Sequence, residues 1–193
     1  MNRQVSQVLA GATTDAASTS RVWRRVVAVA LAAALTAVAA KVAVPLPGIP
    51  VPFTLQPVAV LLAGALLGAS GGFKSQSIYL AAGMVGLPVF AAGGGWAYLL
   101  GPTGGYLLAF PVAAWIVGAF ADRSRSALSI AFGAVVGLAV IHLGGIAWRA
   151  ALSGREAAAA VGHTPFFVGD LLKVALVTVI GAGFGGHVRR WIG

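Results

Sequence analysis

The chain has 193 residues, of which 59% are hydrophobic and only 9% are charged, and its mean hydropathy is +0.94. Soluble domains carry about 25% charged residues, so this composition excludes a soluble globular protein and indicates an integral membrane protein. The net charge of +9 comes from Lys and Arg that lie mostly between apolar segments, and no nucleic-acid-binding motif accompanies them.

The N-terminal segment differs in composition from the rest. Residues 1–22 are rich in Ser, Thr and Ala, and we expect a disordered cytoplasmic tail there. Residues 23–193 are expected to form one domain of six transmembrane helices. The stretch RVWRR before the first apolar run also resembles a signal peptide. That run is about 19 residues long, whereas a signal h-region has about 7–15, so we interpret it as an uncleaved first helix.

Six apolar segments approach the roughly 20 residues that a spanning helix needs. The expected spans are residues 26–44, 53–67, 77–92, 105–121, 127–148 and 166–188. The second and third are short, and the third is broken near Pro88, so the two could instead form one re-entrant unit. With the N-terminus inside, nine basic residues lie on the side of the termini and three, Lys41, Arg149 and Arg155, on the other. This asymmetry predicts that both termini are cytoplasmic.

The connection between the first two spans, VPLPGIPVPFTLQ at residues 44–56, contains four prolines. Proline fixes φ and lacks a backbone donor, so the segment is predicted to be stiff and extended rather than helical. It could be a rigid connector. Its apolar residues favour a second interpretation, in which it folds over a cavity as a lid.

The connection at residues 91–106 is rich in glycine, which allows a backbone to approach a ligand closely. It carries Trp96 and Tyr106. These side chains could anchor the protein at the membrane interface, or they could form stacking walls for a flat ligand. The sequence does not decide between the two.

The last span contains an acid and a base, Asp170 and Lys173, which lie three residues apart and therefore on one helix face. A charge at the centre of a spanning helix costs about 2.5–3.5 kcal/mol on insertion scales. The pair could neutralise itself as an internal salt bridge. We favour a polar cavity in which Asp170 accepts from ligand N–H groups, Lys173 donates, and Gln56 does either.

The chemistry that is missing from the sequence argues against an enzyme. The chain has no cysteine, only four acidic residues and three scattered histidines. It has no HExxH zinc motif and no phosphate-binding GxxxxGK[ST] motif, and we expect no serine nucleophile elbow. We therefore expect a binding or transport protein without a cofactor or metal.

Four motifs in this order resemble the BioY family, the biotin-binding S components of energy-coupling factor (ECF) vitamin transporters. They are VPLPGIPVPFTLQ (44–56), GMVGLPVFAAGGG (83–95), GPTGGY (101–106) and GDLLK (169–173). The resemblance covers roughly residues 25–190. It implies a six-helix membrane subunit that binds biotin near the extracellular face, beneath the loop joining the first two helices.

By the family's pattern, Asp170, Lys173 and Gln56 are the polar contacts. Asp170 would accept from the ureido N–H groups, and Lys173 would meet either the biotin carboxylate or Asp170. Such subunits lack an ATPase, so the resemblance also implies a transmembrane coupling subunit and two ATPase subunits as partners. Small residues on the first helix, Ala30 with Ala34 and Ala33 with Ala37, have the spacing for such a contact.

Two other functions stay open at this point. One is an S component for a different small vitamin. The other is a membrane structural or assembly protein, in which Asp170 and Lys173 only bind each other. In a competition assay, an S component of different specificity would bind another vitamin in place of biotin. A structural or assembly protein would bind no ligand.

Overall fold

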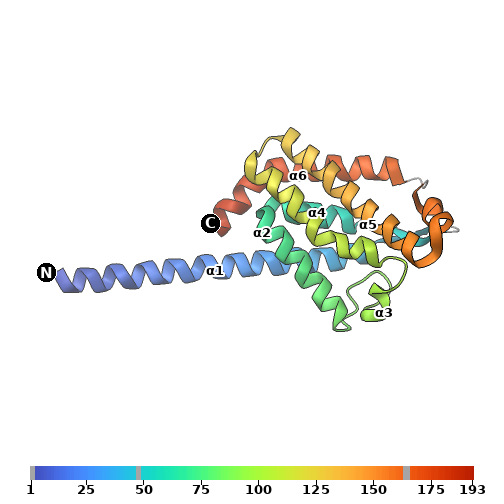
Figure 1. The fold of residues 1–193 in the computed structure, drawn as a ribbon. Helices are drawn as coiled ribbons and strands as arrows, with labels where there is room; N and C mark the ends of the chain where they lie inside the picture. The colour runs from blue at the N-terminus through green and yellow to red at the C-terminus, as the bar shows by residue number, and fades with distance from the viewer. Residues whose placement is uncertain (1–2, 47–48, 163–165) are drawn as a thin grey trace.

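Helices make up most of the protein in this computed structural model, which describes residues 3–46, 49–162 and 166–193 (Figure 1). The elements in chain order are α1 (Arg3–Lys41), β1 (Ala43–Leu46), β2 (Ile49–Thr54), α2 (Gln56–Met84), α3 (Trp96–Leu99), α4 (Gly104–Arg123), α5 (Ala127–Gly162) and α6 (Phe166–Ile192). The strands β1 and β2 form an antiparallel hairpin between α1 and α2.

Within the described ranges, five helical stretches are long and apolar enough to cross a membrane. They are Thr19–Lys41, Gln56–Met84, Gly104–Arg123, Ala127–Gly154 and Gly169–Ile192. The prediction of a helical, multi-pass membrane protein is confirmed. The number differs from the expected six, because α2 contains most of the predicted span 53–67 and the first half, residues 77–84, of the predicted span 77–92.

The helix α2 is not straight. Gly68 has φ +79° and ψ 178°, a positive-φ conformation that glycine adopts without a Cβ clash. The Gln56 side chain hydrogen-bonds the hydroxyl of Tyr79 at 2.7 Å, although 23 residues of straight helix would separate them by about 35 Å. The two arms of α2, residues 56–67 and 69–84, therefore fold back on each other at Gly68.

The N-terminal part of α1 is helical from Arg3, where the sequence predicts a disordered tail over residues 1–22. Figure 1 shows this part projecting beyond the other helices. Ala, Gln and Arg in this segment are good helix formers, which an argument from polarity alone does not weigh. Residues 1–2 lie outside the described part, and disorder of the segment in solution stays a prediction.

The helix α4 lies at the centre and packs against α2 and α5. The buried core between the helices contains Leu61, Ala113, Val117, Ile130 and Val177. Contacts here are close, since a Cβ on Gly64 would collide with the backbone of Ala114. The close helix approach that the Gly and Ala content indicates is thus present.

The two ends of the membrane region meet on one side. Arg24 donates to the backbone oxygen of Trp191 at 3.1 Å, and Arg25 donates to that of Ile192 at 3.1 Å. Since α1 enters the bundle where α6 leaves it, the spanning region begins and ends at the same face.

Candidate functional site

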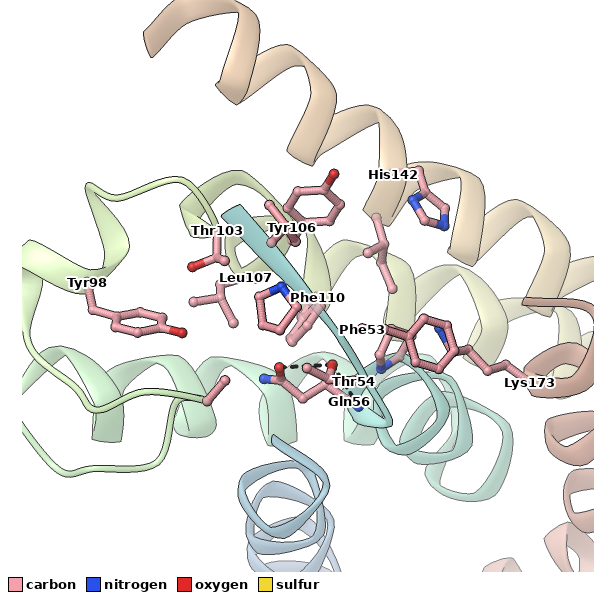
Figure 2. A pocket seen from close by; sticks show the side chains of 15 residues that line it. Phe53, Thr54, Gln56, Tyr98, Thr103, Tyr106, Leu107, Phe110, His142 and Lys173 are labelled. Atoms are coloured by element: carbon pink, nitrogen blue, oxygen red, sulfur yellow. Dashed lines mark hydrogen bonds between the residues drawn. The ribbon is translucent and has the colours of Figure 1, made fainter. Parts of the chain in front are cut away.

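A pocket lies at the end of the bundle opposite to this face, where α1 ends and α2, α4 and α6 begin (Figure 2). Its walls come from β2, the start of α2, the α3 segment, α4, α5 and α6. Its volume of about 60 Å³ is small beside the roughly 300–1,000 Å³ of typical small-molecule sites. A ligand of vitamin size therefore requires one of these walls to move outward.

The β1–β2 hairpin forms one of these walls. Ala43 pairs with Thr54 and Val44 with Phe53. The last residues of β2, 51–54, line the pocket. The extended conformation predicted from the prolines is confirmed for the described part of the segment, while residues 47 and 48 lie outside that part. The hairpin is thus more than a connector, and its position fits the predicted lid.

Phe53 joins the hairpin to α6. Its ring lies over the ammonium of Lys173, with Nζ 3.9 Å from the ring centroid. The same ring covers Gly169, where an added Cβ would lie 2.5 Å from Cζ of Phe53. Figure 2 shows Phe53 and Lys173 together at one end of the pocket and Tyr98 at the other.

Asp170 lies between two basic side chains beside the pocket. Lys173 donates from Nζ to Oδ1 of Asp170 at 2.9 Å, and Nε2 of His142 lies 2.7 Å from Oδ2. A carboxylate can only accept, so Nε2 of His142 carries the proton of that bond. The side chains of Asp170 and Lys173 are only 13% and 6% exposed, so water screens the pair weakly.

Both interpretations of the charged pair describe part of this arrangement. Asp170 and Lys173 do form a salt bridge, and Lys173 and His142 also line the pocket. A carboxylate has about four lone-pair sites, of which the two bases use two. Asp170 therefore has capacity left for N–H donors of a ligand, while Lys173 is already bound to Asp170 and to the Phe53 ring.

Gln56 lines the pocket, but both ends of its amide have protein partners. Its Oε1 accepts from the Thr54 hydroxyl at 3.2 Å, and its Nε2 donates to the Tyr79 hydroxyl at 2.7 Å. Tyr79 in turn donates to the backbone oxygen of Val89 at 3.3 Å. This chain of hydrogen bonds connects the hairpin, both arms of α2 and the loop before α3, so Gln56 shapes the pocket as well as facing it.

The structure separates the two aromatic candidates. Tyr106 lines the pocket from α4. Trp96 is 62% exposed and lies outside the lining, a position that fits the interfacial anchor better than the stacking wall. The turn at Gly95, with φ +92°, starts α3 so that Tyr98 and Leu99 face inward instead. Of the α3 segment, it is Tyr98 that lines the pocket.

The sequence analysis missed His142. A single histidine in an apolar run has no partner nearby in sequence, and Asp170 lies 28 residues further along the chain. The available signal was a polar side chain inside a spanning helix, which favours a functional role. No group of three or more potential metal ligands occurs among the described residues.

We expect Gly169→Ala to destabilise the protein, because the new methyl group collides with the Phe53 ring and forces the hairpin outward. Overpacking of this kind costs about 1–3 kcal/mol. Gly183→Ala on the same helix is the matched control, since its methyl group meets nothing within 4 Å. There, replacing a helical glycine should stabilise by about 0.5–1 kcal/mol. Thermal unfolding in detergent measures both, and equal melting temperatures would contradict this packing.

Known proteins are similar to this chain over most of its length. The sequence model of the BioY family matches residues 7–190. The probable biotin transporter BioY of Pyrococcus horikoshii is 44% identical over 153 residues, which are 79% of this chain and 90% of that protein. The biotin transporter BioY of Thermotoga maritima is 36% identical over 159 residues, 81% of this chain and 93% of that protein.

A solved structure has the same fold. The crystal structure of the S-component for biotin from an ECF-type ABC transporter matches with a TM-score of 0.75 at 27% sequence identity. The match covers 82% of this chain and 88% of that one. The likeness therefore extends over most of both chains.

Proposed function

Since the chain belongs to the BioY family, we propose that it binds biotin as the substrate-binding subunit of an uptake system in the cytoplasmic membrane. The family consists of transporter components and not of enzymes. The observation that carries the proposal is Asp170, an anion beside the pocket that is held by the lining residues His142 and Lys173 and has capacity for further donors.

The chemistry of biotin matches the two ends of the pocket. The ureido ring presents two N–H donors, which suit the free lone pairs of Asp170. The thiophane ring and the valeryl chain are apolar and suit the walls formed by Leu107, Phe110 and Ile141. Of the two roles considered for Lys173, support of Asp170 is favoured by its bond to that carboxylate. The hairpin moves outward to admit the ligand.

The proposed topology has six membrane-crossing segments with both termini in the cytoplasm. The two antiparallel arms of α2 supply the second and third crossings, which brings the five long helices to six. Nine basic residues on the side of the termini support this orientation. The pocket then opens toward the extracellular face.

The chain has no phosphate-binding motif of its own, so we propose that a transmembrane coupling subunit and ATPase subunits energise uptake. The two alanine pairs of α1 differ in their surroundings. Ala33 is buried in the core of the bundle, whereas Ala30 and Ala34 are exposed. Only the Ala30–Ala34 pair is open to a partner helix.

We expect detergent-purified protein to bind biotin with a Kd of about 1 μM or tighter, which corresponds to about −8 kcal/mol. Isothermal titration calorimetry measures this directly. At a biotin concentration of about 100 Kd, the folded state gains roughly 2.7 kcal/mol, so the melting temperature should also rise.

A panel of other water-soluble vitamins in competition is the control for specificity. Binding of another vitamin in place of biotin would show an S component of different specificity. No binding of any vitamin, by folded protein, would contradict the proposal and favour a structural role for the Asp170–Lys173 pair.

A further inference from the structure

Two buried polar atoms near the pocket lack a hydrogen-bond partner in the described part of the chain. They are the hydroxyl of Tyr106 on α4 and Nε of Arg149 on α5. The two groups lie on the same face of α5, because the Tyr106 ring packs on Gly145, one helical turn before Arg149. Buried polar atoms are nearly always satisfied, so a donor pair without an acceptor needs an explanation.

Both groups are hydrogen-bond donors, and the group they lack is an acceptor. No acidic residue forms a salt bridge with Arg149 among the residues that the structure describes. An anion placed at the edge of Tyr106 would accept from the phenol and from the guanidinium together. Arg binds carboxylates in a two-point geometry, which makes it well suited to this role.

The position of Arg149 along α5 sets how far this anion would lie from Asp170. Seven residues of helix separate Arg149 from His142, which is about 10.5 Å and almost two full turns, so both lie on one face. His142 contacts Asp170. Gly145 lies between His142 and Arg149 on α5, and the ring of Tyr106 packs on it. The fused rings and extended valeryl chain of biotin have a comparable length.

Arg149 lies outside the pocket lining, and the contacts of its turn of α5 place it near the end of the pocket away from Lys173. The indole of Trp148 donates to the backbone oxygen of Gly101 at 3.0 Å, which ties this turn of α5 to the loop before α4. Thr103 and Tyr98 line the pocket at this end (Figure 2). A ligand whose donors bind Asp170 therefore directs its opposite end toward Arg149.

The other described basic groups on the outer side already have partners. Lys173 donates to Asp170 and lies over Phe53. Lys41 donates to the backbone oxygen of Phe90 at 2.7 Å, which holds the loop before α3 to the end of α1. Neither offers an uncommitted cation to a ligand anion, whereas Arg149 does.

We propose that Arg149, together with the Tyr106 hydroxyl, binds the carboxylate of biotin, while Asp170 binds the ureido ring at the opposite end. This assignment presupposes the biotin site proposed above and gives the ligand a direction in it. Lys173 then acts on the ureido end only, as a positioning residue for Asp170. The guanidinium and the phenol select a carboxylate over a neutral group.

The test compares biotin with biotinamide, in which a neutral carboxamide replaces the carboxylate. Calorimetry of the wild-type protein should give a preference for biotin of about 10- to 100-fold, the range of a charged hydrogen-bonded pair. Arg149→Met should weaken biotin binding by about that factor and leave biotinamide binding unchanged. Arg149→Lys should keep part of the preference, because it keeps the charge but not the two-point geometry.

Two further variants sharpen the result. Tyr106→Phe removes only the hydroxyl and should reduce the preference several-fold. Lys41→Met is the control cation on the same side of the membrane and should leave the preference as in the wild type. Should Arg149→Met not yield folded protein, Arg149→Lys and Tyr106→Phe decide between the outcomes.

Three results would overturn the assignment. They are equal binding of the two ligands by wild-type protein, an unchanged preference in the Arg149 variants, and a preference lost in Lys41→Met instead. Each leaves the biotin site itself intact, because biotin still binds. If the wild-type protein binds neither ligand, it is the proposed function that fails.

Discussion

Asp170→Asn is expected to weaken biotin binding by at least about 100-fold. The amide keeps the shape of the side chain but loses the charge, and one end becomes an N–H₂ donor that faces Lys173 or His142. Lys173 is only 6% exposed and would keep a charge without its partner. Removing one member of such a shielded pair is costly, at about 3–5 kcal/mol. The ureido donors lose their charged acceptor at the same time.

Calorimetry with biotin measures the effect, and thermal unfolding separates lost binding from lost folding. Glu156→Gln is the control, since Glu156 is an exposed acid near the C-terminal end of α5. It should bind biotin as the wild type does. If Asp170→Asn is folded and binds biotin with unchanged affinity, Asp170 does not contact the ligand, and the carboxylate serves only the salt bridge.

Much of the candidate site was predictable because its residue types are unusual in the segments where they occur. Asp170 and Lys173 are charges in an apolar helix, and the prolines of the hairpin exclude a helix in a chain of helices. These signals are local in sequence and need no knowledge of the packing. The structure adds the partner, His142, whose role depends on how α5 lies against α6.

Other features depend on orientation and could not be read from composition. Whether Trp96 or Tyr98 faces the pocket is decided by the turn at Gly95, which sets the start of a four-residue helix. Gly68 and Gly86 both adopt positive φ, yet of these two only Gly68 lies inside a helix and reverses it. The sequence therefore indicated two short spans but not the residue at which one arm turns into the other.

That reversal at Gly68 leaves three backbone groups of α2 without their usual helical partners. In a continuous helix, the N–H of Ala69 would bond to the oxygen of Ala65. Here that N–H donates to Oδ2 of Asp122 at 2.9 Å. Arg189 of α6 donates to the oxygens of Ala65 at 3.1 Å and Leu66 at 3.3 Å, and it also forms a salt bridge with Asp122.

Arg189→Met is therefore expected to destabilise the fold by about 2 kcal/mol, the typical contribution of hydrogen bonds from a charged group. Backbone oxygens at the edge of a bilayer find few other donors, which makes the loss harder to replace. The salt bridge with Asp122 adds little to this free energy, because Asp122 is 47% exposed and water screens its charge. The melting temperature in detergent should fall by roughly 5 °C.

The neighbouring Arg190→Met tests whether charge alone explains the effect. Arg190 is exposed, so its replacement removes the same charge from the same end of α6 without touching α2. Its melting temperature should stay close to that of the wild type. An equal loss in both variants would mean that the basic end of α6 stabilises the protein through its general charge, and that the oxygens of Ala65 and Leu66 do not need Arg189. A loss confined to Arg189→Met would show that a side chain of the last helix holds the turn of the second, at the opposite end of the bundle from the pocket.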